Sequence, residues 1–260
     1  MTTLIFDCDG VLADTERDGH LVAFNKTFEE FDLSTRWTPA AYSRLLKIGG
    51  GKERLRALTS LSGRDSGIRT PPEEDDVFIA RLHRRKTENF IALVEAGALP
   101  ARPGIARIVS DAAAAGWTLA VASTSAEASV RAVLRSAVGE LASQFEVFAG
   151  DVVSAKKPAP DIYLLALEKL GAEAQDTVVI EDSGPGAAAA AAAGLSHLVT
   201  VSTFTAEDAF PSAAAVVTSL GEGTSAQDLD HVLIDRTSGR VTWPISLQAL
   251  EWIARNGRNP

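Results

Sequence analysis

The sequence is poor in cysteine, methionine and aromatic residues. Its 260 residues include one cysteine, Cys8, and one methionine, and only 6% are aromatic. A single cysteine excludes an intramolecular disulfide, so nothing indicates an oxidising compartment and we expect a cytoplasmic protein. The start of the chain carries no cationic segment and no long apolar run. It therefore predicts neither a signal peptide nor a membrane span, and no membrane partner is expected.

Positive charge is also in short supply. Lys and Arg number 25 against 34 Asp and Glu, which gives a formal net charge of -9 at pH 7. Such a chain offers no broad basic surface for a nucleic-acid backbone, so nucleic acid is not an expected partner. Hydrophobic residues, by contrast, make up 46% of the chain. This composition is typical of a globular protein with one large core, or a core plus a smaller domain, and we expect a monomer.

Short apolar runs and helix-favouring stretches alternate along most of the chain. The stretches between the later runs, such as Asp161–Leu170, have helical length and composition. Runs typical of buried strands occupy residues 3–6, 117–122, 145–148, 177–180 and 197–201. Their alternation with helices predicts an α/β fold with a Rossmann-like, mostly parallel sheet covered on both faces.

One long stretch breaks the alternation. Residues 16–100 have few β-rich runs and many charged, helix-favouring segments. We therefore predict an inserted helical domain over this stretch, while residues 1–15 and 101–260 form the main domain. Within the insertion, the polar residues 63–76 hold two adjacent prolines and predict a loop with a helix start.

The pattern also weakens after Val201. A last strand is predicted at Ala215–Val217, and residues 232–243 suggest a hairpin around Ser238 and Gly239. No residue pattern in this part of the chain indicates chemistry.

The first apolar run ends in an acidic pair. Asp7 and Asp9 lie two residues apart directly after it, so on an extended chain both side chains project to the same side. Paired carboxylates can supply a nucleophile, an acid/base group and metal ligands together. Asp and Gly are also common in turns after strands, so the pair alone fits a plain loop equally well.

Polar residues also follow the second, third and fourth apolar runs. Ser123 and Thr124 bring hydroxyls and backbone amides to a helix start, a natural seat for phosphate or simply a helix cap. Lys157 lies in a lysine pair before a proline, and Glu181 and Asp182 precede another helix. Taken singly, these are ordinary surface lysines and helix-dipole partners. Together they line up at the carboxyl ends of parallel strands, where open α/β sheets bind ligands.

This ordered set resembles the haloacid dehalogenase superfamily. Its four motifs match Asp7-x-Asp9, Ser123, Lys157 before Pro158, and Glu181-Asp182, so the resemblance spans residue 4 to about residue 201. It implies a parallel-sheet core with an inserted helical cap of the C1 type. It also implies a magnesium-dependent phosphatase that forms an aspartyl-phosphate intermediate.

The resemblance assigns a role to each motif residue. It implies that Asp7 is the nucleophile and Asp9 the acid/base, a second carboxyl that dehalogenase members lack. We expect Mg²⁺ to be bound by the Asp7 carboxylate, the Asp9 backbone carbonyl and Asp182, because this ion takes oxygen ligands. Glu181 is expected to act nearby or through water. The phosphoryl oxygens are expected to contact Ser123, Thr124 and Lys157.

Part of the insertion resembles the CbbY branch of this superfamily. A glycine run followed by Lys52 and Arg54 suits contacts with an anion, although a plain helix-start loop also fits it. The branch acts on pentulose bisphosphates, notably xylulose-1,5-bisphosphate, so a small phosphorylated sugar is the expected partner. The resemblance makes Lys52 and Arg54 candidates for a distal phosphate. The full set of cap candidates is Glu16, His20, Gly50, Gly51, Lys52, Glu53, Arg54 and Lys86.

Two rival functions stay open at this point. A β-phosphoglucomutase-like enzyme uses the same core but returns the phosphoryl group to the sugar. A non-enzymatic phosphosugar-binding protein is expected to have lost a motif acid, and every motif acid is present here. The connections of the insertion near Asp14 and Arg102 are the expected hinges for its movement.

Overall fold

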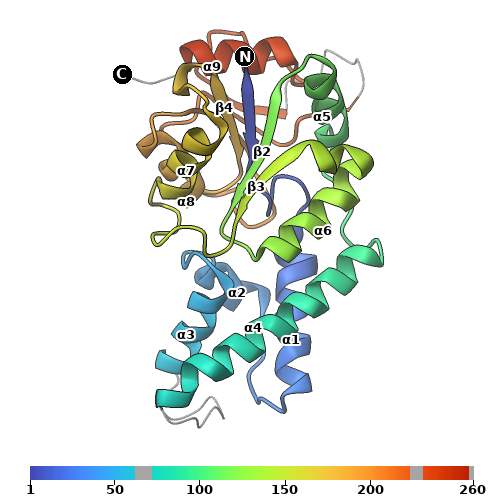
Figure 1. Ribbon diagram of the computed structural model, residues 1–260, viewed down its shortest axis with the longest axis vertical. Helices are drawn as coiled ribbons and strands as arrows, with labels where there is room; N and C mark the ends of the chain where they lie inside the picture. The colour runs from blue at the N-terminus through green and yellow to red at the C-terminus, as the bar shows by residue number, and fades with distance from the viewer. Residues whose placement is uncertain (62–71, 223–230, 258–260) are drawn as a thin grey trace.

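The structure is a computed structural model that describes residues 1–61, 72–222 and 231–257. Figure 1 shows a twisted sheet flanked by helices in the upper half of the view and a group of helices, α1 to α4, below it. This arrangement confirms the predicted α/β class. Within these ranges no helix combines the length and the apolar character needed to cross a membrane.

The strands of the described residues form one sheet in the order β3-β2-β1-β4-β5-β6-β7. All neighbouring pairs are parallel except β6 and β7, which run antiparallel. The predicted hairpin after residue 232 is wrong, because β7 pairs with the earlier β6 and no described residue after it forms a second strand. The strands are β1 (Thr3–Phe6), β2 (Thr118–Ser123), β3 (Phe145–Ala149), β4 (Thr177–Glu181), β5 (Ser196–Thr200), β6 (Ala215–Val217) and β7 (Val232–Asp235).

Alternating residues of β1 bury two separate faces of the sheet. Leu4 and Phe6 join an apolar cluster with α5, α6 and α9, whereas Ile5 joins a cluster with α7 and α8. Because β1 is buried on both faces, residues 3–6 do not alternate between polar and apolar side chains. The covering elements are α5 (Ile105–Ala114), α6 (Glu127–Val138), η2 (Gly139–Gln144), α7 (Asp161–Leu170), η3 (Ala174–Asp176), α8 (Gly184–Ala192) and α9 (Leu247–Asn256).

The helices below the sheet have an apolar cluster of their own. Its centre is aromatic, with ring centroids of Phe24 and Trp37 separated by 4.7 Å and those of Phe28 and Trp37 by 4.9 Å. Such pairs contribute beyond simple burial. The helical character predicted between residues 16 and 100 is present, while the domain boundaries stay a prediction. The elements are η1 (Glu16–His20), α1 (Leu21–Glu30), α2 (Pro39–Leu45), α3 (Gly51–Leu61) and α4 (Pro72–Glu95).

The loop predicted over residues 63–76 falls mostly outside the described residues. From Pro72 onward the chain is the helix α4.

The two connections between the sheet and these helices run side by side. Ala13 and Ala101 form an antiparallel bridge, and the Arg102 amide donates to the Leu12 carbonyl at 2.9 Å. The Arg102 guanidinium, which lies at a predicted hinge, donates to backbone carbonyls of Gly10, Thr200, Val201 and Thr218. Both connections are therefore tied to the ends of the strands.

Candidate active site

Residues of the predicted site meet at the carboxyl ends of three neighbouring strands. Asp7 directly follows β1, and its amide donates to the Ile180 carbonyl at 2.9 Å, which extends the ladder towards β4. Ser123 is the last residue of β2 and Glu181 the last residue of β4. Because β1 lies between these strands, residues far apart in sequence lie at one edge, where the strand order reverses.

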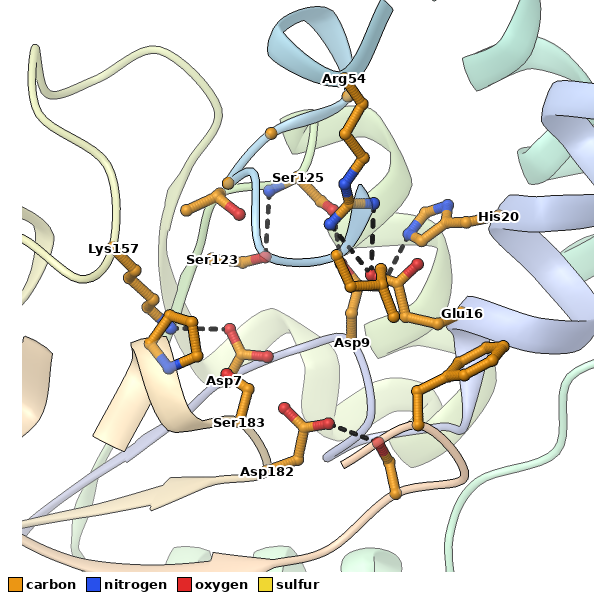
Figure 2. A pocket seen from close by; sticks show the side chains of 18 of the residues that line it. Asp7, Asp9, Glu16, His20, Arg54, Ser123, Ser125, Lys157, Asp182 and Ser183 are labelled. Atoms are coloured by element: carbon orange, nitrogen blue, oxygen red, sulfur yellow. Dashed lines mark hydrogen bonds and ion pairs between the residues drawn. The ribbon is translucent and has the colours of Figure 1, made fainter. Parts of the chain in front are cut away.

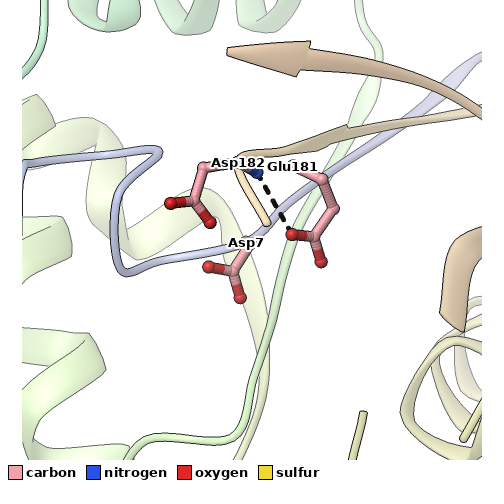
Figure 3. A group of neighbouring side chains, drawn as sticks. All are labelled: Asp7, Glu181 and Asp182. Carbon is pink, nitrogen blue, oxygen red and sulfur yellow. Dashed lines mark hydrogen bonds between the residues drawn. The ribbon is translucent and has the colours of Figure 1, made fainter. Parts of the chain in front are cut away.

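Three buried carboxylates form a compact cluster at this edge (Figure 3). Oxygen atoms of Asp7, Glu181 and Asp182 lie within 4.8 Å of one another. Burial, opposed by Lys157 and reinforced by Glu181 and Asp9, raises the pKa of Asp7 to about 7. Burial, together with the charges of Asp7 and Glu181, also raises the pKa of Asp182 well above its usual range. The cluster therefore calls for added positive charge.

Lys157 supplies part of that charge. Its ammonium donates to Asp7 at 2.8 Å, to Glu181 at 2.6 Å and to the Ala122 carbonyl at 2.9 Å. Burial opposes the charged form, but the charges of Asp7 and Glu181 outweigh it and hold the pKa of Lys157 well above its usual value. Glu181 also accepts a hydrogen bond from Tyr163. Lys157 thus neutralises Glu181 and holds Asp7.

The remaining donor atoms fit a hard divalent cation. The carboxylates of Asp7 and Asp182 offer oxygen ligands of the kind that Mg²⁺ and Ca²⁺ take. Gly10 permits this approach, because a Cβ atom there would lie 2.0 Å from the Asp182 carboxylate. The backbone at Gly10 also has φ +80, a conformation that favours glycine. A bulkier residue after Asp9 would therefore push Asp182 away from the cluster.

Asp9 is held by a different set of partners (Figure 2). Thr15 donates to it at 2.6 Å, His20 lies at 2.9 Å, and the Ser125 hydroxyl donates to its second oxygen. Burial opposes ionisation, but the His20 charge and these hydrogen bonds outweigh it and hold the pKa of Asp9 below its usual range. Since His20 in turn contacts Lys86 of α4 at 2.7 Å, Asp9 is linked to the helical insertion.

Residues 123–126, just before α6, line the same cavity. The Ser123 hydroxyl accepts from the Ser125 amide at 3.2 Å and is 1% exposed, so it is a fixed part of the wall. The predicted residues that line this cavity are Asp7, Asp9, Glu16, His20, Gly50, Gly51, Arg54, Lys86, Ser123, Thr124, Lys157 and Asp182.

Two predicted cap residues take part in other contacts. Lys52 pairs with Asp151 at 2.5 Å, and Glu53 pairs with Lys156 at 3.1 Å. Lys156 also contacts Asp151 at 3.0 Å, so the four charges bridge α3 and the loop after β3. Hydrogen bonds from the two lysines lower the pKa of Asp151 to about 2. Neither Lys52 nor Glu53 lines the cavity around Asp7.

Several residues of the site were missed from the sequence. The Tyr42 hydroxyl donates to Glu16 at 2.6 Å and accepts from Arg54 at 2.9 Å, so it orients both predicted cap residues. Ser202 donates to Asp182 at 2.6 Å, and Phe204 lines the same cavity. A tyrosine within a helix and a serine after a strand carry no distinctive spacing, so no sequence pattern could have identified them.

Comparison with known proteins defines the class. A family model described as haloacid dehalogenase-like hydrolase matches residues 1–194. The chain therefore belongs to this family of hydrolases, as its four motifs predicted. Its fold and the carboxylates at the strand ends agree with that membership.

The most informative relatives are CbbY proteins. The chain is 48% identical to a CBBY-like protein of Arabidopsis thaliana over 85% of this chain and 70% of that protein. It is 44% identical to the plasmid-encoded protein CbbY of Cupriavidus necator, over 85% and 87% of the two chains. A crystal structure of a CbbY variant from Rhodobacter sphaeroides with xylulose-(1,5)bisphosphate has 38% identity and a TM-score of 0.76, over 84% and 95%. These likenesses confirm the CbbY-like branch and a sugar phosphatase.

Proposed function

We propose that this phosphatase hydrolyses a pentulose bisphosphate, such as xylulose-1,5-bisphosphate, with Mg²⁺ and through an aspartyl-phosphate on Asp7. One observation carries the proposal: a buried Asp7 held by Lys157 at 2.8 Å shares a single cavity with Asp9 and with cationic residues of the helical insertion. The bisphosphate bound by the similar Rhodobacter sphaeroides protein supports the substrate class.

The metal ion would be held by the Asp7 carboxylate, the Asp9 backbone carbonyl and Asp182. When bound it supplies positive charge, which lets an anionic nucleophile approach an anionic phosphate ester. Glu181 supports this site indirectly, because its ion pair with Lys157 at 2.6 Å fixes the ammonium beside Asp7.

In the first step an oxygen of Asp7 bonds to phosphorus and the bond from phosphorus to the sugar oxygen breaks. Asp9 gives its proton to that leaving oxygen and later takes a proton from the water that hydrolyses the aspartyl-phosphate. The three hydrogen bonds that Asp9 accepts keep it ionised, which is the form that takes a proton from water. Its role as an acid requires the protonated carboxyl, which the negative charge of a phosphate ester bound nearby would favour.

Ser123, Thr124 and Lys157 are proposed to hold the non-bridging phosphoryl oxygens. Phosphoryl transfer relies on positioning and charge stabilisation more than on covalent chemistry by the protein. A lysine already fixed by two carboxylates and a serine fixed at a strand end need little rearrangement to do this.

The opposite wall of the cavity would recognise the rest of the substrate. Arg54 and Lys86 supply positive charge for the distal phosphate, while Glu16 and His20 face the sugar hydroxyls. Arg54 is the stronger candidate, because Tyr42 orients its guanidinium at 2.9 Å. Lys52 would have to leave Asp151 before it could bind a phosphate.

A substrate panel tests the proposal. Phosphate release is measured with Mg²⁺ from xylulose-1,5-bisphosphate, xylulose 5-phosphate and glucose 1-phosphate, and again after chelation. We expect the bisphosphate to have the highest kcat/KM. Equal values across the panel would reject a dedicated bisphosphatase, and exchange of phosphate position without release would indicate a mutase. The monomeric state and the cytoplasmic location stay proposals, the latter supported by the absence of cysteine pairs.

A further inference from the structure

We propose that the segment after β5, residues 201–205, positions Asp182 and couples its position to that of the helical insertion. Ser202 is the positioning residue. We call this segment the β5 loop. The inference rests on the proposed metal site, because Asp182 is one of its ligands. It assigns a role to residues outside the four motifs.

Ser202 holds one oxygen of Asp182 in a defined direction. Its hydroxyl donates to Asp182 at 2.6 Å, and the two residues are only 6% and 5% exposed. The same hydroxyl lies 3.0 Å from the Thr205 hydroxyl, while the Ser202 amide donates to that oxygen at 2.9 Å. A hydroxyl has one proton to donate, so Thr205 is the donor to Ser202 and Ser202 the donor to Asp182. The second Asp182 oxygen is left for the cation.

The residues just before Ser202 are attached to the returning connection of the insertion. The Arg102 guanidinium donates to the carbonyl of Thr200 at 2.9 Å and to that of Val201 at 2.6 Å. Arg102 also donates to the Gly10 carbonyl, in the turn after Asp9. The Arg102 side chain therefore links the returning connection of the insertion, the turn after Asp9 and the start of the β5 loop.

The residue after Ser202 is attached to the outgoing connection. Both the amide and the hydroxyl of Thr203 donate to the carboxylate of Asp14, the amide at 3.1 Å. Asp14 immediately precedes Thr15, whose hydroxyl donates to Asp9 at 2.6 Å. The hydrogen bonds on either side of Ser202 thus lead to the two connections on which the insertion would move.

The next residue touches the insertion itself. The Phe204 ring packs edge-on against Tyr42 of α2, with centroids 6.2 Å apart. Tyr42 donates to Glu16 and accepts from Arg54, both on the substrate side of the cavity. Consecutive residues of one short loop therefore contact Asp182, the outgoing connection and the substrate-binding helices. Movement of the insertion would shift Ser202 and with it Asp182.

A loop that merely packs against its neighbours would affect stability and nothing else. If the β5 loop instead positions Asp182, its loss should weaken binding of the metal alone. Residues that orient metal ligands typically contribute ten- to a hundredfold to metal affinity. Direct binding of Mg²⁺ to the full chain, without substrate, separates the two interpretations.

The test is calorimetric titration of Mg²⁺ into four variants and the natural chain. We expect Ser202→Ala to raise the Kd for Mg²⁺ about tenfold, and Ser202→Thr, which keeps a hydroxyl, to restore most of the affinity. Ser196→Ala is the matched control, because Ser196 is 1% exposed on β5 and its hydroxyl donates to the Ala254 carbonyl of α9. Phe204→Leu keeps the hydroxyl of Ser202 and should raise the Kd about threefold through the contact with Tyr42.

Each result supports or overturns the positioning role of Ser202 or the link between the β5 loop and the insertion. A Kd of Ser202→Ala within twofold of the natural chain, or an equal loss in Ser196→Ala, overturns the positioning role. An unchanged Kd in Phe204→Leu overturns the link to the insertion. If the natural chain itself binds no Mg²⁺ and its turnover survives chelation, the proposed metal-dependent function fails first and this inference with it.

Discussion

The two walls of the cavity are built in different ways. On the strand side, Asp7 and Ser123 sit at or next to strand ends, so the backbone ladder of the sheet fixes where they lie. On the helical side, Arg54 is held by side-chain contacts to Tyr42 and Glu16 and by the Ile48 carbonyl. The proposed chemistry therefore rests on backbone geometry, whereas the proposed recognition of the substrate rests on side-chain contacts.

The charges on the two walls are also balanced differently. Lys157 is surrounded by Asp7 and Glu181, which raise its pKa. Lys86 on the helical wall is buried with less compensation, and burial lowers its pKa to about 8. The helical wall therefore carries buried positive charge that an anionic substrate could compensate. The strand wall keeps an excess of negative charge, because Lys157 faces three buried carboxylates.

The largest effect should come from the strand wall. Asp7→Asn keeps the shape of the side chain but removes the nucleophile, so turnover should fall by a factor on the order of 10⁴ or more. The fold should persist, because a neutral amide relieves the crowding of three buried carboxylates. Steady-state phosphate release and thermal melting measure the two effects, and retained turnover in the pure variant would reject Asp7 as the nucleophile.

Removal of the metal should cause the next largest loss of phosphate release. With EDTA in excess, phosphate release should drop on the order of a hundredfold or more and return when Mg²⁺ is added back, because the carboxylate cluster then lacks its compensating charge. Activity of the chelated enzyme equal to that of the untreated enzyme would remove the metal from the proposal.

A change on the helical wall should act on binding rather than on chemistry. Arg54→Lys loses the planar fork that Tyr42 orients, so kcat/KM for the bisphosphate should fall roughly tenfold, mostly through KM. Arg56→Lys, an exposed neighbour on α3 paired with Asp76, is the matched control and should change little. A fall confined to kcat would place Arg54 with the catalytic residues instead.

The smallest effect should come from the ion pairs between the two walls. Lys52 and Asp151 are 35% and 57% exposed, and such pairs contribute about 0–1 kcal/mol. Lys52→Ala and Asp151→Ala should therefore change kcat/KM equally and by less than about threefold. A much larger loss in Lys52→Ala alone would show that Lys52 leaves Asp151 to bind the distal phosphate.

The same contrast explains what could be predicted from the sequence. Asp7, Ser123 and Asp182 could be identified because a short apolar run followed by a polar residue is a local pattern, and the sheet brings the run ends together. Lys157 was found through its neighbouring proline. The hairpin near residue 232 was predicted wrongly, because its first strand finds its partner in β6 rather than in the residues that follow it.

Other residues could not be predicted because only the folded chain brings their partners together. Tyr42 and Glu16 are separated by 26 residues and meet only when α2 packs against η1. Ser202 reaches Asp182 because β4 and β5 are neighbours, yet the loop after a strand has no fixed length or direction. The contacts of Lys52 and Glu53 likewise depend on how α3 approaches the loop after β3.

The bridge between Ala13 and Ala101 affects how the insertion can vary during evolution. Because the insertion leaves and rejoins the core at paired backbone positions, the loop-closure entropy of a longer or shorter insertion changes only slowly with its length. Helical modules of different size can therefore be exchanged at this point without altering the sheet register. If the insertion recognises the sugar, as proposed above, such an exchange would change the substrate and leave the carboxylates at the strand ends in place.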